Sequence, residues 1–344
     1  PARRLDHEDV ARRHLGRSDV LEHLDAPVGT LDTIDAGPAR LPAGHPDLAA
    51  LAGVNAQAQS GGYAGEKVCL GCHTQENAHY SETGHASAFR ANPANDLERR
   101  GCEACHGPGA AHAKSSGDKS LIVGFTRSWG TPPDQQASQC LSCHSGGNRM
   151  HWPGSIHASN QLSCADCHNP MMKGSAAGLL VRPTINEVCQ NCHRQQRSEF
   201  MKRSHMPLPE GKMSCVDCHN PHGTVTRPLL KTDNVNSLCY SCHAEKRGPF
   251  LWEHAPVREN CLNCHSPHGS NQDKLLASPR PQLCQQCHSP SVGHPGQFYR
   301  GDQTALASQM VGGAASQRMI GRSCQNCHSQ IHGSNHPSGA RFQR

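Results

Sequence analysis

The sequence predicts a multihaem cytochrome c, mostly irregular, with short α-helices wrapped around a linear row of ten haems and almost no β-structure. The first observation is that all 20 cysteines lie in ten copies of the pentapeptide Cys-x-x-Cys-His. The second is a shortage of core residues, because hydrophobic residues make up 35% of the 344-residue chain, cysteines included, and aromatic residues 4%. The third is a content of 33 Gly and 24 Pro, which interrupts long helices and strands.

The pentapeptide is the attachment signature of c-type haem. Its two thiols, spaced on one turn, add across the haem vinyl groups, and the adjacent histidine then lies under the iron as the proximal ligand. We number the motifs 1 to 10 in chain order. We expect ten covalently bound haem c groups, one at each motif. The attaching residues are Cys69, Cys72, Cys102, Cys105, Cys140, Cys143, Cys164, Cys167, Cys189, Cys192, Cys215, Cys218, Cys239, Cys242, Cys261, Cys264, Cys284, Cys287, Cys324 and Cys327. The proximal ligands are His73, His106, His144, His168, His193, His219, His243, His265, His288 and His328.

Zinc ribbons or a disulfide framework are the alternatives for so many cysteines. Zinc sites pair two Cys-x-x-Cys units and do not require His after each second cysteine. A disulfide framework would leave some cysteines outside the motif. Because His follows in all ten copies, the sequence indicates haem.

Ten apolar macrocycles would supply the missing core, and the thioether links would tie the backbone to them. We therefore expect folding to depend on haem, as small metal domains depend on their ion. The formal net charge of +5 does not indicate a nucleic-acid partner, since haem propionates oppose it and no basic stripe is interleaved with aromatic residues.

The chain divides into a leader and a haem-binding part. Residues 1–62 contain no cysteine, and their pattern predicts a helix at 6–24 followed by a linker rich in Pro, Gly and Ala. Residues 63–344 form the predicted decahaem domain, for which we expect two pentahaem halves, about 63–200 and 201–344. The motifs start every 22 to 40 residues, and the middle of the chain shows a two-haem repeat. Such repetition implies a linear, modular stack.

Histidines outside the motifs are candidates for the second axial ligand of each iron. Of the 26 histidines, 16 lie outside the motifs, and 12 of these lie in the haem region, against ten irons. We therefore expect six-coordinate, low-spin haems, a state that suits electron transfer. The candidates are His85, His112, His157, His205, His222, His254, His268, His294, His332 and His336. Together with Met171 they make eleven candidate ligands for ten irons, one more than needed. His79 and His151 are left out because they do not lie in a turn with Gly or Pro.

Methionine replaces histidine at one position of the repeat. The residue three after the proximal histidine is His222 or His268 in two copies and Met171 in the first. Either Met171 is an axial ligand, with Met172 as a stand-in, or the ligand is lost and the side chain only packs on a haem edge. We expect ligation, which favours ferrous iron and raises the potential of one haem. Such a haem would suit a weak external reductant such as ferrous iron.

The motif also indicates the compartment. Haem is attached to it outside the cytoplasm, so we expect an exported, periplasmic protein. No signal peptide begins at Pro1 to Leu5, so the numbering is expected to start at a mature or trimmed end. The apolar stretches are far shorter than the roughly 20 residues of a transmembrane helix.

Two segments resemble the MtrA/DmsE family of decahaem cytochromes. One runs from Cys-Tyr-Ser-Cys-His-Ala-Glu-Lys-Arg-Gly-Pro to Cys-His-Ser-Pro-His268-Gly-Ser, and the other is Cys324-Gln-Asn-Cys-His-Ser-Gln-Ile-His332-Gly-Ser-Asn-His336-Pro. Cys102-Glu-Ala-Cys-His-Gly-Pro-Gly is similar too. The resemblance covers all ten motifs, whereas the long leader departs from the family pattern.

The resemblance implies a place at or inside an outer-membrane β-barrel porin, which would shield the polar backbone from lipid. It implies an extracellular multihaem cytochrome, mineral or metal on one side and a periplasmic or inner-membrane electron carrier on the other. The implied function is an electron conduit across the outer membrane, in metal oxidation or reduction.

Two other functions compete with the conduit. A multihaem reductase needs an iron with an open position, but all ten motifs end in His and second ligands are ample. We therefore expect an electron carrier with no catalytic residue. A soluble periplasmic electron shuttle would use the same haem row, and the sequence distinguishes it poorly from a conduit.

Overall fold

The computed structural model describes residues 62–288, 324–337 and 339–342. The chain divides into two units, Pro1–Ala50 and Leu51–Arg344, and the described residues all belong to the second. The helix expected at 6–24 and the candidate ligand His294 lie outside the described residues. The leader boundary at residue 62 and the two pentahaem halves stay predictions.

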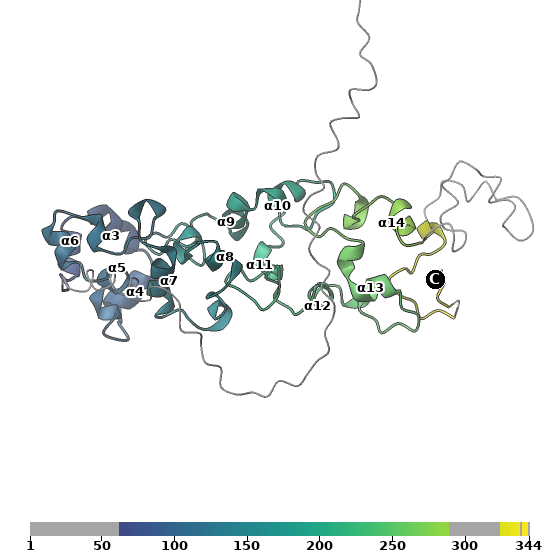
Figure 1. The fold of residues 1–344 in the computed structure, drawn as a ribbon, viewed down its shortest axis with the longest axis horizontal. Coiled ribbons are helices and arrows are strands. Elements are labelled where there is room, and N and C mark those ends of the chain that lie inside the picture. The colour runs from purple at the N-terminus through teal and green to yellow at the C-terminus, as the bar shows by residue number, and fades with distance from the viewer. Residues whose placement is uncertain (1–61, 289–323, 338, 343–344) are drawn as a thin grey trace, which may run out of the picture. The chain divides into compact units, whose positions relative to one another are not determined.

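Short helices joined by long loops make up the described chain, and Figure 1 follows them in chain order. Among the described residues, the longest helix has nine residues. The α-helices are α2 (Glu66–Leu70), α3 (Thr74–Tyr80), α4 (Gly84–Ala91), α5 (Glu103–His106), α6 (Ala110–Lys114), α7 (Pro133–Leu141), α8 (Ile156–Ser159), α9 (Ile185–Cys192), α10 (Arg194–Glu199), α11 (Cys215–Cys218), α12 (Val235–Tyr240), α13 (Ala255–Glu259) and α14 (Gln282–Gln285). The 3-10 helices are η1 (Glu98–Arg100), η2 (Lys119–Leu121), η3 (Arg127–Trp129), η4 (Gly147–Arg149), η5 (Cys164–Asp166), η6 (Ala244–Lys246), η7 (Cys261–Asn263), η8 (Asp273–Leu275) and η12 (Cys324–Asn326).

The β-structure of the described residues is limited to isolated bridges. Short helices, long loops and almost no β-structure are what the sequence predicts, so the predicted fold class is confirmed. No helix in the described ranges has the length and hydrophobicity to cross a membrane.

The ten motifs alternate between two local structures. Odd-numbered motifs complete a preceding helix, namely α2, α7, α9, α12 or α14, whereas even-numbered motifs form a separate helical turn, namely α5, η5, α11, η7 or η12. In every motif the backbone N–H of the histidine donates to the backbone carbonyl of the first cysteine at 2.8–3.1 Å. Because positions i, i+3 and i+4 share one face of such a turn, both sulfurs and the imidazole lie on the same side of the backbone.

The loops after motifs 4, 6 and 8 fold back on their own motif. In each of them the motif histidine pairs in an isolated antiparallel bridge with a leucine, namely Leu180, Leu230 or Leu276. Leu230 and Leu276 are buried. The bridge fixes the end of each loop beside the proximal histidine of its own motif.

Glycine allows three of the loop tips to approach another segment closely. Gly223, Gly269 and Gly333 have φ angles of 117°, 159° and 137°. A Cβ at these positions would meet the backbone of His151, the backbone of Glu199 and the ring of Phe250, respectively. Each of these contacts joins a loop after an even motif to a segment after an odd motif.

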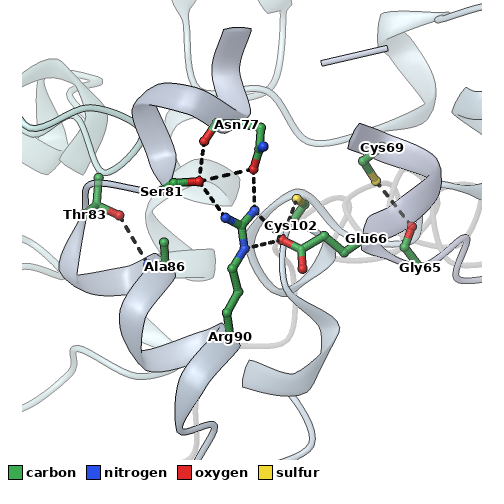
Figure 2. A network of polar contacts seen from close by, with 9 residues as sticks. All are labelled: Gly65, Glu66, Cys69, Asn77, Ser81, Thr83, Ala86, Arg90 and Cys102. Carbon is green, nitrogen blue, oxygen red and sulfur yellow. Dashed lines mark hydrogen bonds and ion pairs between the residues drawn. The ribbon is translucent and has the colours of Figure 1, made fainter. Parts of the chain in front are cut away.

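Arg90 holds the first three helices together (Figure 2). Its guanidinium donates to Glu66 Oε1 of α2 at 2.7 and 2.9 Å, to Asn77 Oδ1 of α3 at 2.6 Å and to Ser81 Oγ at 2.8 Å. The thiol of Cys102 lies 3.6 Å from the same Glu66 oxygen. The network therefore joins the helices around motif 1 to the start of motif 2.

Glu103 makes a second connection between motifs 1 and 2. Glu103 is the residue after the first cysteine of motif 2 and is 3% exposed. Its carboxylate accepts hydrogen bonds from three backbone N–H groups. Oε1 accepts from Ala64 at 2.8 Å and from Gly109 at 2.7 Å, and Oε2 accepts from Gly65 at 2.8 Å. These bonds satisfy a buried carboxylate and fix the segment that enters α2.

The hydrophobic core that the polypeptide itself provides is small. The buried hydrophobic residues of the described chain are Tyr80, Ala86, Ala104, Val123, Ala137, Trp152, Phe200, Leu208, Leu230 and Leu276. Three of these are alanines, and no large side chain in the described ranges is fully buried. A core of this size does not stabilise so long a chain, which agrees with the expectation that haem supplies the rest.

Candidate functional site

The cysteines of successive motifs are neighbours along the described chain. The first cysteine of each odd motif lies close to the first cysteine of the next even motif. The second cysteine of each even motif lies close to the second cysteine of the next odd motif. The first-cysteine neighbours are Cys69 with Cys102, Cys140 with Cys164, Cys189 with Cys215, Cys239 with Cys261, and Cys284 with Cys324. The second-cysteine neighbours are Cys105 with Cys143, Cys167 with Cys192, Cys218 with Cys242, and Cys264 with Cys287. The series runs from motif 1 to motif 10 without a break.

Seven motif histidines in the described chain face a second histidine from elsewhere in the sequence. The ring centres of each pair lie 5.9–6.3 Å apart. The pairs are His73 with His112, His144 with His85, His168 with His222, His193 with His157, His219 with His268, His265 with His332, and His288 with His254.

The spacing of these pairs fits an iron between the two rings. A bond from an imidazole nitrogen to a first-row metal is about 2.0–2.1 Å and the ring centre lies roughly 1 Å beyond, so two rings on opposite faces of one ion have centres about 6 Å apart. One histidine of each pair belongs to a Cys-x-x-Cys-His turn, so the two sulfurs that haem attachment needs lie beside it. The residues present therefore fit haem c.

Six of the seven pairs follow a fixed register along the chain, whereas His73 of motif 1 faces His112 from the loop after motif 2. The even motifs 4, 6 and 8 receive a ring from the loop directly after the even motif two places later, namely His222, His268 or His332. The odd motifs 3, 5 and 9 receive a ring from the segment before the preceding even motif, namely His85, His157 or His254. Each pair therefore joins parts of the chain that one or two motifs separate.

Backbone carbonyls hold the other ring nitrogen of many of these histidines. In even motifs the carbonyl contacts the proximal histidine. For example, His168 Nδ1 lies 2.6 Å from the Gly178 carbonyl, and His219 Nδ1 lies 2.9 Å from the Pro228 carbonyl. For odd motifs the opposite ring is held, as with His157 Nδ1 to the Pro221 carbonyl at 2.8 Å. A metal-bound imidazole usually donates its second N–H in this way, which fixes the ring and leaves Nε2 for the metal.

The remaining carbonyl contacts follow the same division. Among even motifs, Nδ1 of His106, His265 and His328 contacts the carbonyls of Val123, Lys274 and Arg341 at 2.8, 2.9 and 2.5 Å. Opposite odd motifs, Nδ1 of His112 and His254 contacts the carbonyls of Asp118 and Ile331 at 2.8 and 3.0 Å. His85 differs, because its Nδ1 is buried without a hydrogen-bond partner.

Burial lowers the pKa of several paired histidines. It is the main cause for His85, His193, His222, His254 and His332. A lowered pKa favours the neutral imidazole, and this is the form that binds iron.

The comparisons with known proteins agree with these sites. A family described as a doubled CXXCH motif matches residues 157–198, 205–248 and 254–293, and a cytochrome c-type NrfB-like family matches residues 102–177. The protein named multiheme cytochrome MtrA from Shewanella baltica (strain OS185) is 44% identical over 243 residues, which are 71% of this chain and 70% of the relative. The chain belongs to the MtrA family of multihaem c-type cytochromes. The MtrA-family chain therefore binds haem c, and electron transfer is the function of such proteins.

A solved structure was also found, with a weak likeness to the MtrA-family chain. The undecahaem cytochrome from the S-layer of Carboxydothermus ferrireducens is 20% identical, with a TM-score of 0.15, and the match covers 71% of this chain and 32% of that one.

Three proximal histidines of the MtrA-family chain have other surroundings. His106 packs against Phe125, with ring centres 5.2 Å apart, and is half-buried. His243 Nδ1 lies 3.7 Å from Glu245, and His328 Nδ1 donates to the Arg341 carbonyl as above. In the described ranges no imidazole faces His106 or His243 at the spacing of the seven pairs.

The predicted ligands outside the pairs are His205, His294, His336 and Met171. His205 Nδ1 contacts the Lys202 carbonyl at 2.7 Å, and its Nε2 contacts Glu210 at 3.0 Å. The His336 N–H donates to Ser334 Oγ at 3.1 Å. His79 and His151, which the sequence leaves out, form none of the seven pairs.

Met171 lies in a turn equivalent to the turn that holds His222 in the next copy of the repeat. The Met171 N–H donates to Asn169 Oδ1 at 3.1 Å, and the His222 N–H donates to Asn220 Oδ1 at 3.2 Å. The following position differs, because Met172 stands where the other loops have Gly223, Gly269 or Gly333. Met172 has no positive φ and is 42% exposed, so this loop has a side chain in solvent where the others have glycine.

Sequence reasoning did not find the register of the pairs, the carbonyl contacts or the carboxylate of Glu199. Glu199 Oε2 lies 3.4 Å from His268 Nδ1, opposite the motif histidine His219. The repeat could have indicated the register, because His222 and His268 are equivalent positions. No sequence pattern marks the carbonyl acceptors or the contact of Glu199.

Proposed function

We propose that this MtrA-family cytochrome carries ten haem c groups in one row and conducts electrons across the outer membrane. The observation that carries the proposal is the series of neighbouring cysteines from motif 1 to motif 10, together with the seven imidazole pairs. A haem at each turn would have a neighbour at the preceding and the following turn. Such a row transfers electrons in either direction along its gradient of potential.

Each iron in this proposal has two protein ligands, so the protein is an electron carrier and not an enzyme. The seven pairs would each hold one iron, with one histidine on each face. By the same register, His205, in the segment before motif 6, would serve the iron of His243, as His157 and His254 serve theirs. Its Nε2 would then leave Glu210 for the iron when haem is attached. His294 or His336 would remain for the iron of His328.

Met171 would be the second ligand of the haem at His106. The rings after motifs 6, 8 and 10 face motifs 4, 6 and 8, so the residue at the same place after motif 4 should face motif 2. The turn at Asn169 supports this assignment because it matches the turn before His222. One His/Met haem beside bis-histidine neighbours would have a raised potential.

A membrane conduit also needs partners. We propose an outer-membrane β-barrel porin around the chain, an extracellular multihaem cytochrome, mineral or metal as one electron partner, and a periplasmic or inner-membrane carrier as the other. The barrel would shield polar loops from lipid, since irregular backbone crosses hydrocarbon only when protein surrounds it. The chain would be exported and would reside in the periplasm or within that barrel.

Cross-linking followed by purification from outer membranes tests this proposal. We expect a β-barrel protein to co-purify with the cytochrome in a constant ratio. Recovery of the cytochrome only in the soluble periplasmic fraction, with no barrel attached, would favour an electron shuttle instead. Binding of carbon monoxide by the reduced native protein would indicate an open iron and favour a reductase.

A further inference from the structure

Glu199 distinguishes the His219–His268 pair from the other pairs. Its Oε2 lies 3.4 Å from His268 Nδ1, and its side chain is 23% exposed. His73 also has a carboxylate near Nδ1, that of Glu76, but the distance is 3.7 Å and the two side chains are 49% and 58% exposed. Among the ring pairs of the described chain, only His219–His268 has a carboxylate this close to Nδ1 and this well shielded from water.

The surrounding structure fixes Glu199 in place. It ends α10, and its Oε1 accepts from Gln195 Nε2, one turn earlier, at 3.2 Å. Phe200 is 5% exposed and packs on His268 with ring centres 5.5 Å apart. Gly269, next to His268, approaches the Glu199 carbonyl so closely that a Cβ would not fit. The carboxylate is therefore held against the imidazole by packing on both sides.

The two equivalent pairs lack such a carboxylate. In the described chain, neither His222 nor His332, the rings that take the place of His268 in the neighbouring copies, forms an ion pair with a carboxylate. Glu199 is therefore specific to the middle of these three equivalent positions.

A carboxylate that accepts the second N–H of a metal-bound imidazole makes that imidazole a more basic ligand. A more basic ligand and a nearby negative charge both stabilise ferric iron relative to ferrous iron, because ferric iron carries one more positive charge. A nearby cation acts in the opposite direction. Hydrogen bonding to the sulfurs and axial ligands is the means by which proteins tune iron potentials.

We propose that Glu199 is a positioning residue that lowers the reduction potential of the haem at Cys215 and Cys218 below the potentials of its two repeat equivalents, whose rings His222 and His332 have no carboxylate partner in the described chain. The proposal rests on the proposed ligation of that haem by His219 and His268. The haem of motif 6 would then have a lower potential than the haems of motifs 4 and 8.

Glu199→Gln in the ten-haem holoprotein tests this role, with Glu76→Gln as the matched control. Spectroelectrochemical titration should show one component of low potential shifted upward in Glu199→Gln and retained in Glu199→Asp. Electron paramagnetic resonance should show changed g values for one bis-histidine haem, because the imidazole loses the carboxylate beside its Nδ1. Glu76→Gln should change neither measurement as much. Mass spectrometry verifies that all variants keep the same haem content.

His268→Ala separates the failure of this proposal from the failure of the ligation. If ligation is correct, the variant has one high-spin haem that binds carbon monoxide when reduced. A high-spin haem in His268→Ala together with unchanged potentials and g values in Glu199→Gln would refute the role of Glu199 alone. Low-spin signals from every haem of His268→Ala would refute the proposed ligation itself.

Discussion

His168 and His222 face each other with ring centres 6.1 Å apart and ring planes 14° from parallel. His168 belongs to motif 4, whereas His222 follows motif 6, so motif 5 and its helix α9 lie between them in sequence. The loop that carries His222 is held by the bridge between His219 and Leu230. One loop therefore fixes the proximal histidine of its own motif and supplies a ring to a motif two places earlier.

Replacement of His222 by alanine should convert one haem from low spin to high spin. The iron at His168 would lose one imidazole, and no other histidine of the described chain faces it. Absorption and electron paramagnetic resonance spectra of the purified protein measure the change, and the reduced variant should bind carbon monoxide. His151→Ala is the control, because His151 forms none of the pairs, and a high-spin haem in that variant would contradict the assignment.

Replacement of Met171 should change one haem only. The oxidised native protein should show a His/Met band in near-infrared magnetic circular dichroism, and Met171→His should replace that band with the bis-histidine signature and lower one potential. Met171→Leu should leave one iron without a sixth protein ligand. Met172→Leu serves as the control. A native spectrum with only bis-histidine bands would rule out ligation by methionine.

Much of the site could be predicted from the sequence because haem attachment is local. The two cysteines and the histidine of each motif occupy one helical turn, so spacing alone indicates their roles. The second histidines could be nominated only by subtraction, since each comes from a distant loop. The sequence nominates both His222 and His268, but their partners depend on the folding of loops such as the one closed by Leu230.

Other features of the fold leave no mark in the sequence. The acceptors of histidine Nδ1 are backbone carbonyls, which every residue has. Glu103 and Glu199 read as ordinary charged residues, although one is buried on three backbone N–H groups and the other lies against His268. These roles depend on tertiary contacts between motifs, and composition or periodicity carries no information about them.

Replacement of Glu103 by alanine should loosen the segment that enters motif 1. Three backbone N–H groups would lose their acceptor in a buried site, so we expect the local opening free energy to fall by roughly 2–4 kcal/mol. Hydrogen exchange at the amides of Ala64, Gly65 and Gly109 measures this fall. Glu103→Gln, which keeps one acceptor oxygen, should lose less. Unchanged exchange at all three amides in Glu103→Ala would contradict the contacts.

Replacement of Arg90 by lysine should weaken the connections among α2, α3 and α4. Lysine keeps the charge but cannot bind Glu66, Asn77 and Ser81 at once, and we expect a loss of about 1 kcal/mol in local stability. Limited proteolysis and hydrogen exchange of residues 66–91 measure the effect. Arg99→Lys is a suitable control, because the Arg99–Asp96 pair is mostly exposed. Equal protection in both variants would show that the network contributes nothing.

The structure of the haem-loaded protein, determined by electron cryomicroscopy, tests the haem row most directly. We expect ten macrocycles in one row in the order of the motifs, each close to contact with the next, with His168 and His222 on opposite faces of one iron. Two haem clusters separated by a wide gap, or irons of motifs 1, 3, 4, 5, 6, 8 and 9 bound by histidines other than those that face each other here, would contradict the conduit.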